Sequence, residues 1–194
     1  KEEIIQRAFK YHSQGNIQEA VKHYQYCINQ GFDDHRVFSN YGVILTNLGK
    51  LQEAELSTRK AIEIQPNFVD YHLNLGSILI DLGNLKGAEI SYRIATEINP
   101  ELAIPLTNLG NVLRDLGKLQ EAELSTRKAI EINPDNAIAH YNLANILEDL
   151  GKRKEAEISY RKAIEIKPGF AEAHANLGNI LKDLGKIKEA EISM

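Results

Sequence analysis

Small residues recur every 34 positions from one end of this sequence to the other. Six glycines keep the spacing: Gly15, Gly49, Gly83, Gly117, Gly151 and Gly185. Six alanines keep it as well: Ala20, Ala54, Ala88, Ala122, Ala156 and Ala190. A fixed period of this length is typical of stacked copies of one small unit, because no single copy can bury its own apolar face. The spacing therefore predicts a single array over residues 1–194 and favours a binding scaffold over an enzyme.

The four prolines that share the period, Pro66, Pro100, Pro134 and Pro168, set the boundaries of the copies. With proline as residue 32, the repeats cover 1–34, 35–68, 69–102, 103–136 and 137–170, followed by a partial copy at 171–194. In the fifth copy, apolar residues at helical spacing predict helices over about 137–150 and about 153–166. Gly151 ends the first helix and Pro168 follows the second. The short connection makes the two helices antiparallel, so the predicted fold class is all-α.

Composition excludes several classes of partner and site. The net charge of −4 provides no basic surface for nucleic acid or for an anionic membrane. The single cysteine, Cys27, rules out an internal disulfide framework, and we expect a buried, inert thiol. No apolar run approaches the roughly 18 residues that a membrane-spanning helix needs. No secretory signal is visible, although the sequence begins at Lys1 rather than Met and can be a trimmed piece. The expected location is cytoplasmic.

The repeat resembles the tetratricopeptide repeat (TPR), whose signature spans 34 residues. In the fifth copy the signature positions read His140, Leu143, Ala144, Leu147, Ala156, Tyr160, Ala163 and Pro168. The first copy departs most, with Ile4, Arg7 and Phe32 at signature positions, which suggests an N-terminal cap. The resemblance implies a TPR solenoid coiled into a right-handed superhelix with a concave groove. The amino-acid sequence of the repeats is most similar to that of the repeat arm of O-linked N-acetylglucosamine transferases and of bacterial TPR proteins. No transferase domain is visible.

An asparagine column occupies the sixth position of the copies: Asn40, Asn74, Asn108, Asn142 and Asn176. Asparagine is a poor residue for a helix interior, so five in register need a reason. The resemblance implies that this stripe of the first helices faces the concave groove. Position 9 adds Asn111, Asn145 and Asn179 to the stripe. Position 13 adds Asp81, Asp115, Asp149 and Asp183.

These residues suit an extended peptide. One carboxamide both donates and accepts, so it can satisfy a peptide C=O and N–H together. Packed helices lie about 8–10 Å apart, and an extended strand rises about 3.3 Å per residue, so each asparagine would meet roughly every third peptide residue. The aspartates favour peptides that carry some Lys or Arg. In the resembling transferase arm an asparagine ladder grips the peptide main chain, which implies the same role here. Two alternatives stay open: the asparagines brace neighbouring copies, and the aspartates cap or pair locally.

We expect the other groups of polar residues in the sequence to have structural roles rather than catalytic or metal-binding ones. His72, His140 and His174 share position 4, but in adjacent copies they would lie about 10 Å apart, too far to share a zinc ion, so we expect core packing. No catalytic triad, phosphate loop or metal-binding motif is present, which predicts no enzyme activity, no cofactor and no metal. Four Glu–Arg pairs at i, i+4 predict a solvated convex surface. They are Glu55–Arg59, Glu89–Arg93, Glu123–Arg127 and Glu157–Arg161.

The predicted function is a non-catalytic scaffold for an extended protein or peptide partner. An alternative is that the chain forms the substrate-recruiting arm of a larger enzyme such as a glycosyltransferase. A third hypothesis is self-association, because the partial sixth copy would leave its apolar residues uncovered. These residues are Leu177, Ile180, Leu181 and Ile187.

Overall fold

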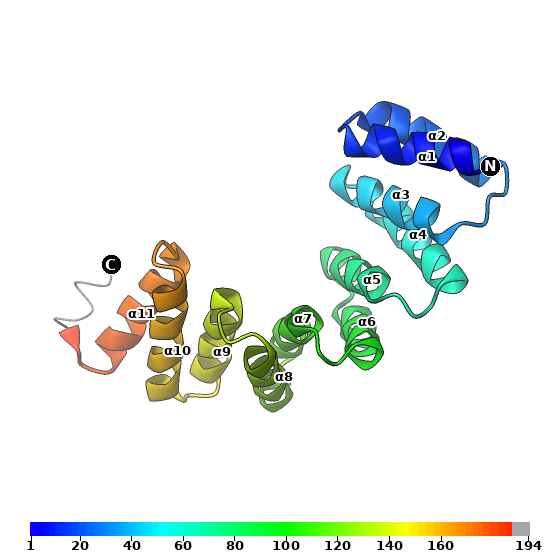
Figure 1. Cartoon of the computed structure of the whole chain (residues 1–194). Coiled ribbons are helices and arrows are strands. Elements are labelled where there is room, and N and C mark those ends of the chain that lie inside the picture. The colour runs from blue at the N-terminus through cyan, green and yellow to red at the C-terminus, as the bar shows by residue number, and fades with distance from the viewer. Residues whose placement is uncertain (188–194) are drawn as a thin grey trace. The chain divides into compact units, whose positions relative to one another are not determined.

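The computed structural model describes residues 1–187, which contain eleven helices and no strand. They pack as two compact units, the first over Lys1–Ile98 and the second from Asn99 onward. The first unit comprises α1 (Glu2–Ser13), α2 (Ile17–Asn29), α3 (His35–Asn47), α4 (Leu51–Ile64), α5 (Val69–Asp81) and α6 (Leu85–Ile98). The second comprises α7 (Ala103–Asp115), α8 (Leu119–Ile132), α9 (Ala137–Asp149), α10 (Arg153–Ile166) and α11 (Ala171–Asp183). Figure 1 shows successive helices folding back on each other within each unit, which confirms the all-α prediction.

Local sequence explains where the helices begin and end. At the end of α9, Gly151 has φ of +74°, a left-handed conformation that glycine adopts without a steric penalty. The next amide, on Lys152, donates to the Leu147 carbonyl at 2.8 Å and closes the helix end. At the start of α9, the Asn136 side chain accepts from the amides of Ile138 and Ala139. The predicted helix over 153–166 matches α10, and the one over 137–150 is a single residue too long.

The core of each unit lies between the helix pairs. The alanines that follow each turn, such as Ala88 and Ala156, are fully buried and let two backbones approach closely. Tyr92 and Tyr160, at position 24 of their copies, are among the largest fully buried side chains. Gly76 also has a packing role, because a Cβ at this position would lie 2.4 Å from the Tyr92 ring.

The sixth copy is covered better than its sequence suggests. Leu177, Ile180 and Leu181 were expected to lie uncovered, and this was wrong: all three are buried. They belong to one core cluster with Tyr160, because α11 packs its apolar side against α10. Only Ile187 of the four predicted residues is exposed.

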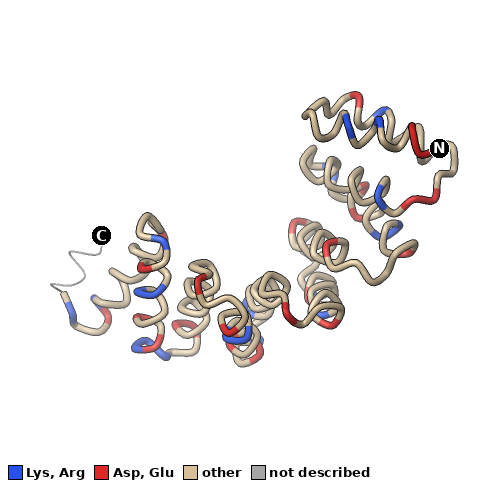
Figure 2. Tube along the Cα trace, viewed as in Figure 1, with Lys and Arg blue, Asp and Glu red and all other residues tan. Residues whose placement is uncertain are grey.

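The second helices carry the predicted Glu–Arg pairs, with N–O distances of 2.8 to 3.0 Å. Figure 2 shows acidic and basic residues interleaved along α10. The expectation that these glutamates are solvated was wrong in both units, because Glu89 and Glu157 are buried and Glu55 and Glu123 are half-buried. In the second unit, Glu123 and Glu157 each also accept from a lysine of the next copy: Lys152 Nζ lies 2.7 Å from Glu123, and Lys186 Nζ lies 2.7 Å from Glu157. The pairs therefore join one copy to the next as well as one helical turn to another.

These ion pairs predict a pH-dependent stability. Burial raises the pKa of Glu123 and Glu157, but hydrogen bonds from a lysine and an arginine outweigh it and leave each pKa below its usual value. A carboxyl whose pKa is lowered by folding stabilises the fold above its unfolded pKa of about 4.3, and this contribution is lost as pH falls through the folded pKa. We expect the urea midpoint, followed by circular dichroism, to fall below pH of about 4.3. The Glu123→Gln/Glu157→Gln double variant should show a shallower fall, and an unchanged pH profile would contradict the assignment.

Candidate functional site

The asparagine stripe, defined as Asn40, Asn74, Asn108, Asn142 and Asn176, lies on the first helix of each hairpin. On α7, spacings of four, three and four residues place Ile104, Asn108, Asn111 and Asp115 on one face. The corresponding residues of α9 share a face in the same way, and α7 packs beside α9. Four members of the stripe are half-buried, and Asn142 is 8% exposed.

In the first unit, Asn40 lines a shallow pocket of about 330 Å³ together with Phe9, His12 and Tyr24. Its Nδ2 donates to the Arg36 carbonyl at 3.0 Å, one turn back on α3, so this donor is used locally. His12 Nδ1 lies 3.2 Å from the Tyr24 hydroxyl, and burial lowers the pKa of this histidine. The side chain of Asn74, on α5, forms no hydrogen bond with any residue that the structure describes.

The last member of the stripe is held by its neighbours. Asn176 Nδ2 lies 3.2 Å from Asn145 Oδ1 and 3.3 Å from the hydroxyls of Tyr141 and Tyr160. The Tyr160 hydroxyl directs its proton to Asn145 Oδ1 at 2.6 Å or to Glu148 Oε2 at 2.9 Å. Burial, followed by the nearby Glu148 carboxylate, raises the pKa of Tyr160. The network joins α9, α10 and α11, so Asn176 braces the copies.

Asn108 and Asn142 lack such a network. Asn142 Nδ2 is buried without a hydrogen-bond partner, and the Asn108 side chain forms no hydrogen bond with the described residues. For Asn142, the difference from Asn176 lies in the residue at position 24 of the preceding copy. Ahead of Asn176 this position holds Tyr160, whose hydroxyl reaches the stripe, whereas ahead of Asn142 it holds Thr126, whose Oγ1 is itself buried and unpartnered. The shorter Thr126 therefore leaves the Asn142 carboxamide without the tyrosine hydroxyl that contacts Asn176.

Some of the remaining predicted site residues form ion pairs or hydrogen bonds through their side chains, and others do not. All four aspartates are exposed. Arg114 Nε donates to Asp149 at 2.5 Å, which raises the pKa of Arg114, and Arg153 lies 3.5 Å from Asp183. The carboxylates of Asp81 and Asp115 form no ion pair or hydrogen bond with the described residues. At position 9, Asn145 belongs to the tyrosine network, Asn111 is half-buried and Asn179 is exposed.

The sequence analysis assigned only polar side chains to the face that carries the asparagine stripe. Two apolar side chains also lie there. Ile104 and Ile138 lie on the same stripe, four residues before Asn108 and Asn142, and are 60% and 56% exposed. Two exposed isoleucines on adjacent helices form an apolar edge beside the carboxamides. The signal was present in the sequence, because both occupy position 2 of their copies.

The position 4 histidines close the loops between copies. His72 Nε2 lies 2.8 Å from the Pro66 carbonyl, and the same contact joins His140 to Pro134 and His174 to Pro168 at 2.9 Å. Within residues 1–187, no three His, Cys, Asp or Glu side chains cluster as metal ligands would. Cys27 is buried, and burial raises the pKa of its thiol.

Family models of the tetratricopeptide repeat match most of the sequence. One matches twice in succession, at residues 35–68 and 69–102, and another matches 137–170. Two further TPR models match 110–151 and 159–192. The chain belongs to the tetratricopeptide repeat family. The helix pairs of this TPR protein have the 34-residue step of the matched repeats.

Solved structures agree with the TPR solenoid. The crystal structure of MamA is 27% identical, with a TM-score of 0.73 over 78% of this chain and 89% of that one. A tetratricopeptide repeat protein from Parabacteroides merdae is 22% identical, with a TM-score of 0.85 over 99% of this chain and 76% of that one. YrrB, described as a TPR protein with an unusual peptide-binding site, is 21% identical, with a TM-score of 0.71 over 88% of each chain. No curated protein sequence matches significantly. None of the described helices is long and apolar enough to span a membrane.

Proposed function

We propose that this TPR protein is a non-catalytic interaction scaffold that binds an extended peptide through the peptide main chain. One observation carries the proposal: Asn74, Asn108 and the Nδ2 of Asn142 have no partner among the described residues. Among these groups only Asn142 Nδ2 is buried. A buried polar group without a partner costs about 1–3 kcal/mol, so a ligand that satisfies it gains affinity. The described peptide-binding site of YrrB, a protein of the same fold, supports the assignment by analogy.

The chemistry of the free carboxamides matches a peptide group. Each amide offers a donor and an acceptor, and each peptide unit offers the complementary pair. The terminal amide of Asn142 can rotate, which exchanges Nδ2 and Oδ1 at its exposed edge. Because neighbouring first helices lie about 8–10 Å apart and an extended strand rises about 3.3 Å per residue, successive carboxamides meet every third peptide residue.

Side chains beside the stripe add preferences. Asp81 and Asp115 are exposed and free, so they favour Lys or Arg in the bound peptide. Ile104 and Ile138 favour an apolar residue at the neighbouring edge. The remaining predicted members, Asn40 and Asn176, contribute less because their donors are used within the protein.

The proposal is tested on the peptide rather than on the protein. Peptides selected from a random library are resynthesised with single backbone amides replaced by esters, which removes one N–H without changing a side chain. At about every third position, affinity measured by fluorescence anisotropy should fall roughly threefold to tenfold, the value of one hydrogen bond. An alanine scan should show smaller effects away from basic and apolar residues. A flat ester series with a steep alanine series would contradict main-chain recognition.

A second candidate rests on residues 173–186, AHANLGNILKDLGK, which resemble the arm of O-linked N-acetylglucosamine transferases. In this case the same stripe would hold a substrate for a catalytic domain elsewhere in the polypeptide. The full-length reading frame decides between the two, because only the second candidate requires a catalytic domain.

A further inference from the structure

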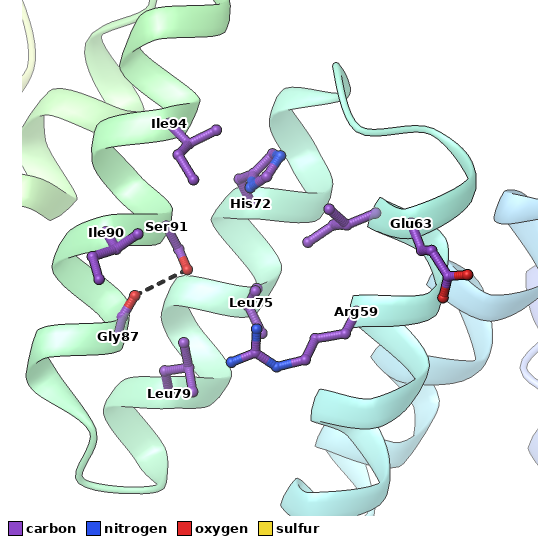
Figure 3. Close-up of a pocket in the computed structure, with 10 residues that line it drawn as sticks. Arg59, Glu63, His72, Leu75, Leu79, Gly87, Ile90, Ser91 and Ile94 are labelled. Carbon is purple, nitrogen blue, oxygen red and sulfur yellow. Dashed lines mark hydrogen bonds between the residues drawn. The ribbon is translucent and has the colours of Figure 1, made fainter.

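A pocket of about 420 Å³ lies in the first unit, away from the asparagine stripe. Figure 3 shows it between α4, α5 and α6, with Arg59 on one side and Ile90 and Ile94 on the other. Its walls are mostly aliphatic, from Ile62, Leu75 and the two isoleucines of α6. No member of the stripe lines it. The helix pair therefore has a second hollow surface, on another side of α5.

The same pocket occurs again in the second unit. A pocket of about 360 Å³ lies between α8, α9 and α10, where each lining residue sits 68 positions beyond its counterpart in the first. Its residues Arg127, Ile130, His140, Leu143 and Ile158 repeat Arg59, Ile62, His72, Leu75 and Ile90. Both units thus form a similar hollow, in which Lys162 of the second pocket replaces Ile94 of the first.

Apolar surface remains in water at both pockets. Ile90 is 61% exposed and Ile158 is 68% exposed, although both are aliphatic and line a pocket. A concave, mostly apolar site with a small number of placed polar groups is the usual form of a binding pocket. Covering these side chains with an apolar ligand removes that surface from water.

The polar group in the first pocket is a single acceptor with a fixed direction. His72 Nε2 contacts the Pro66 carbonyl, which cannot donate, so Nε2 carries the proton and the neutral ring leaves Nδ1 as an acceptor. His72 is 95% buried, and its Nδ1 has no hydrogen-bond partner. In the second unit, His140 makes the same contact with Pro134, so its ring has the same orientation. A ligand that places an N–H or O–H donor here satisfies this nitrogen.

The rim adds a cation. The Arg59 side chain is half-exposed while its guanidinium contacts Glu55, and Arg127 occupies the same place in the second pocket. A guanidinium beside an apolar wall is a partner for the face of an aromatic ring. Aromatic side chains with a polar atom at one end combine a large apolar surface with one donor.

We propose that these pockets are a second binding site, which takes one donor-bearing aromatic side chain, tyrosine or tryptophan, from a partner protein. The aliphatic walls contact the ring, the histidine Nδ1 accepts the O–H or N–H, and the arginine lies against the ring. A ligand that offers only acceptors at the deep end leaves Nδ1 of the neutral ring without a partner. The site does not depend on the asparagine stripe, so a partner can occupy it together with a peptide.

The test uses N-acetyl-L-tyrosinamide and N-acetyl-L-tryptophanamide as probes, followed by NMR of the His72 and His140 rings. We expect saturable shifts with a Kd on the order of 1 mM, a value suited to ligands of this size. The O-methyl ether of the tyrosine probe has the same ring without the donor, and it should bind about tenfold more weakly. Tighter binding of one probe identifies the preferred side chain.

Matched variants decide whether the pocket is responsible. Ile90→Glu should abolish the shifts at His72 and leave those at His140, because it places a carboxylate in one pocket only. Leu56→Glu changes an equally exposed aliphatic residue, 71% exposed at the same position of the preceding copy, that does not line the first pocket, and it should bind like the wild type. Absence of saturable shifts, equal affinity for the O-methyl probe, or equal loss in the Leu56 variant would each overturn the proposal.

Discussion

Tyr160→Ala should lower the free energy of unfolding by about 3–5 kcal/mol, the usual cost of truncating a large buried aromatic side chain. Tyr160 is fully buried and its ring centroid lies 5.9 Å from that of Tyr141. Its hydroxyl also holds Asn145 and Asn176 in place. The change therefore leaves a cavity and removes partners from two polar side chains at once. Urea denaturation at neutral pH, followed by circular dichroism, measures the loss.

Two variants separate the ring from the hydroxyl. Tyr160→Phe keeps the ring and should cost about 1–2 kcal/mol, because Asn145 and Asn176 lose a shared partner. Thr126→Ala, at the equivalent position one copy earlier, should cost about 1 kcal/mol, because it removes one buried methyl group. No hydrogen bond is lost, since Thr126 Oγ1 has no partner. If Tyr160→Phe is as stable as the wild type, the hydroxyl network does not brace the copies.

The Asn108→Ala/Asn142→Ala double variant should bind a selected peptide about 100-fold more weakly while keeping its stability within about 1 kcal/mol. Each carboxamide is expected to make two main-chain hydrogen bonds worth about 0.5–1.5 kcal/mol, so the loss of both reaches this fold-change. Stability is preserved because neither the Asn108 side chain nor the Asn142 Nδ2 has a partner in the folded chain. Isothermal calorimetry gives the affinity, and urea denaturation gives the stability.

Asn176→Ala is the matched control for the double variant. It removes the same chemical group from the same position of the repeat, but one that already has three contacts within the protein. We expect it to lose about 1–2 kcal/mol of stability and little affinity. If the double variant binds and unfolds like the wild type, peptide capture by these two carboxamides is ruled out.

Most of the fold followed from local sequence. The helix predicted over about 153–166 matches α10, because apolar periodicity and the Gly151 turn act within a few positions of each other. The family could also be recognised from the sequence, because each copy resembles the repeat signature at the same turn and contact positions. Local rules were insufficient where a residue of another copy decides the environment. Glu157 reads as a solvated surface residue until Lys186 and the burial of its carboxylate are seen.

The sequence predicted which residues make up the candidate site but not which of their polar atoms are hydrogen-bonded within the protein. All five stripe asparagines were named from register, yet the sequence could not distinguish the braced Asn176 from the unsatisfied Asn142. That distinction depends on whether a tyrosine hydroxyl or a shorter threonine lies across the helix contact. The pockets of α4–α6 and α8–α10 could not be predicted from the sequence either, because the walls of each pocket come from three helices. The sequence by itself determined the helices, their period and the polar stripe, since these depend on neighbours along the chain. Only the tertiary structure decided which polar atoms are satisfied and where apolar surface stays open, because both depend on distances between side chains far apart in sequence.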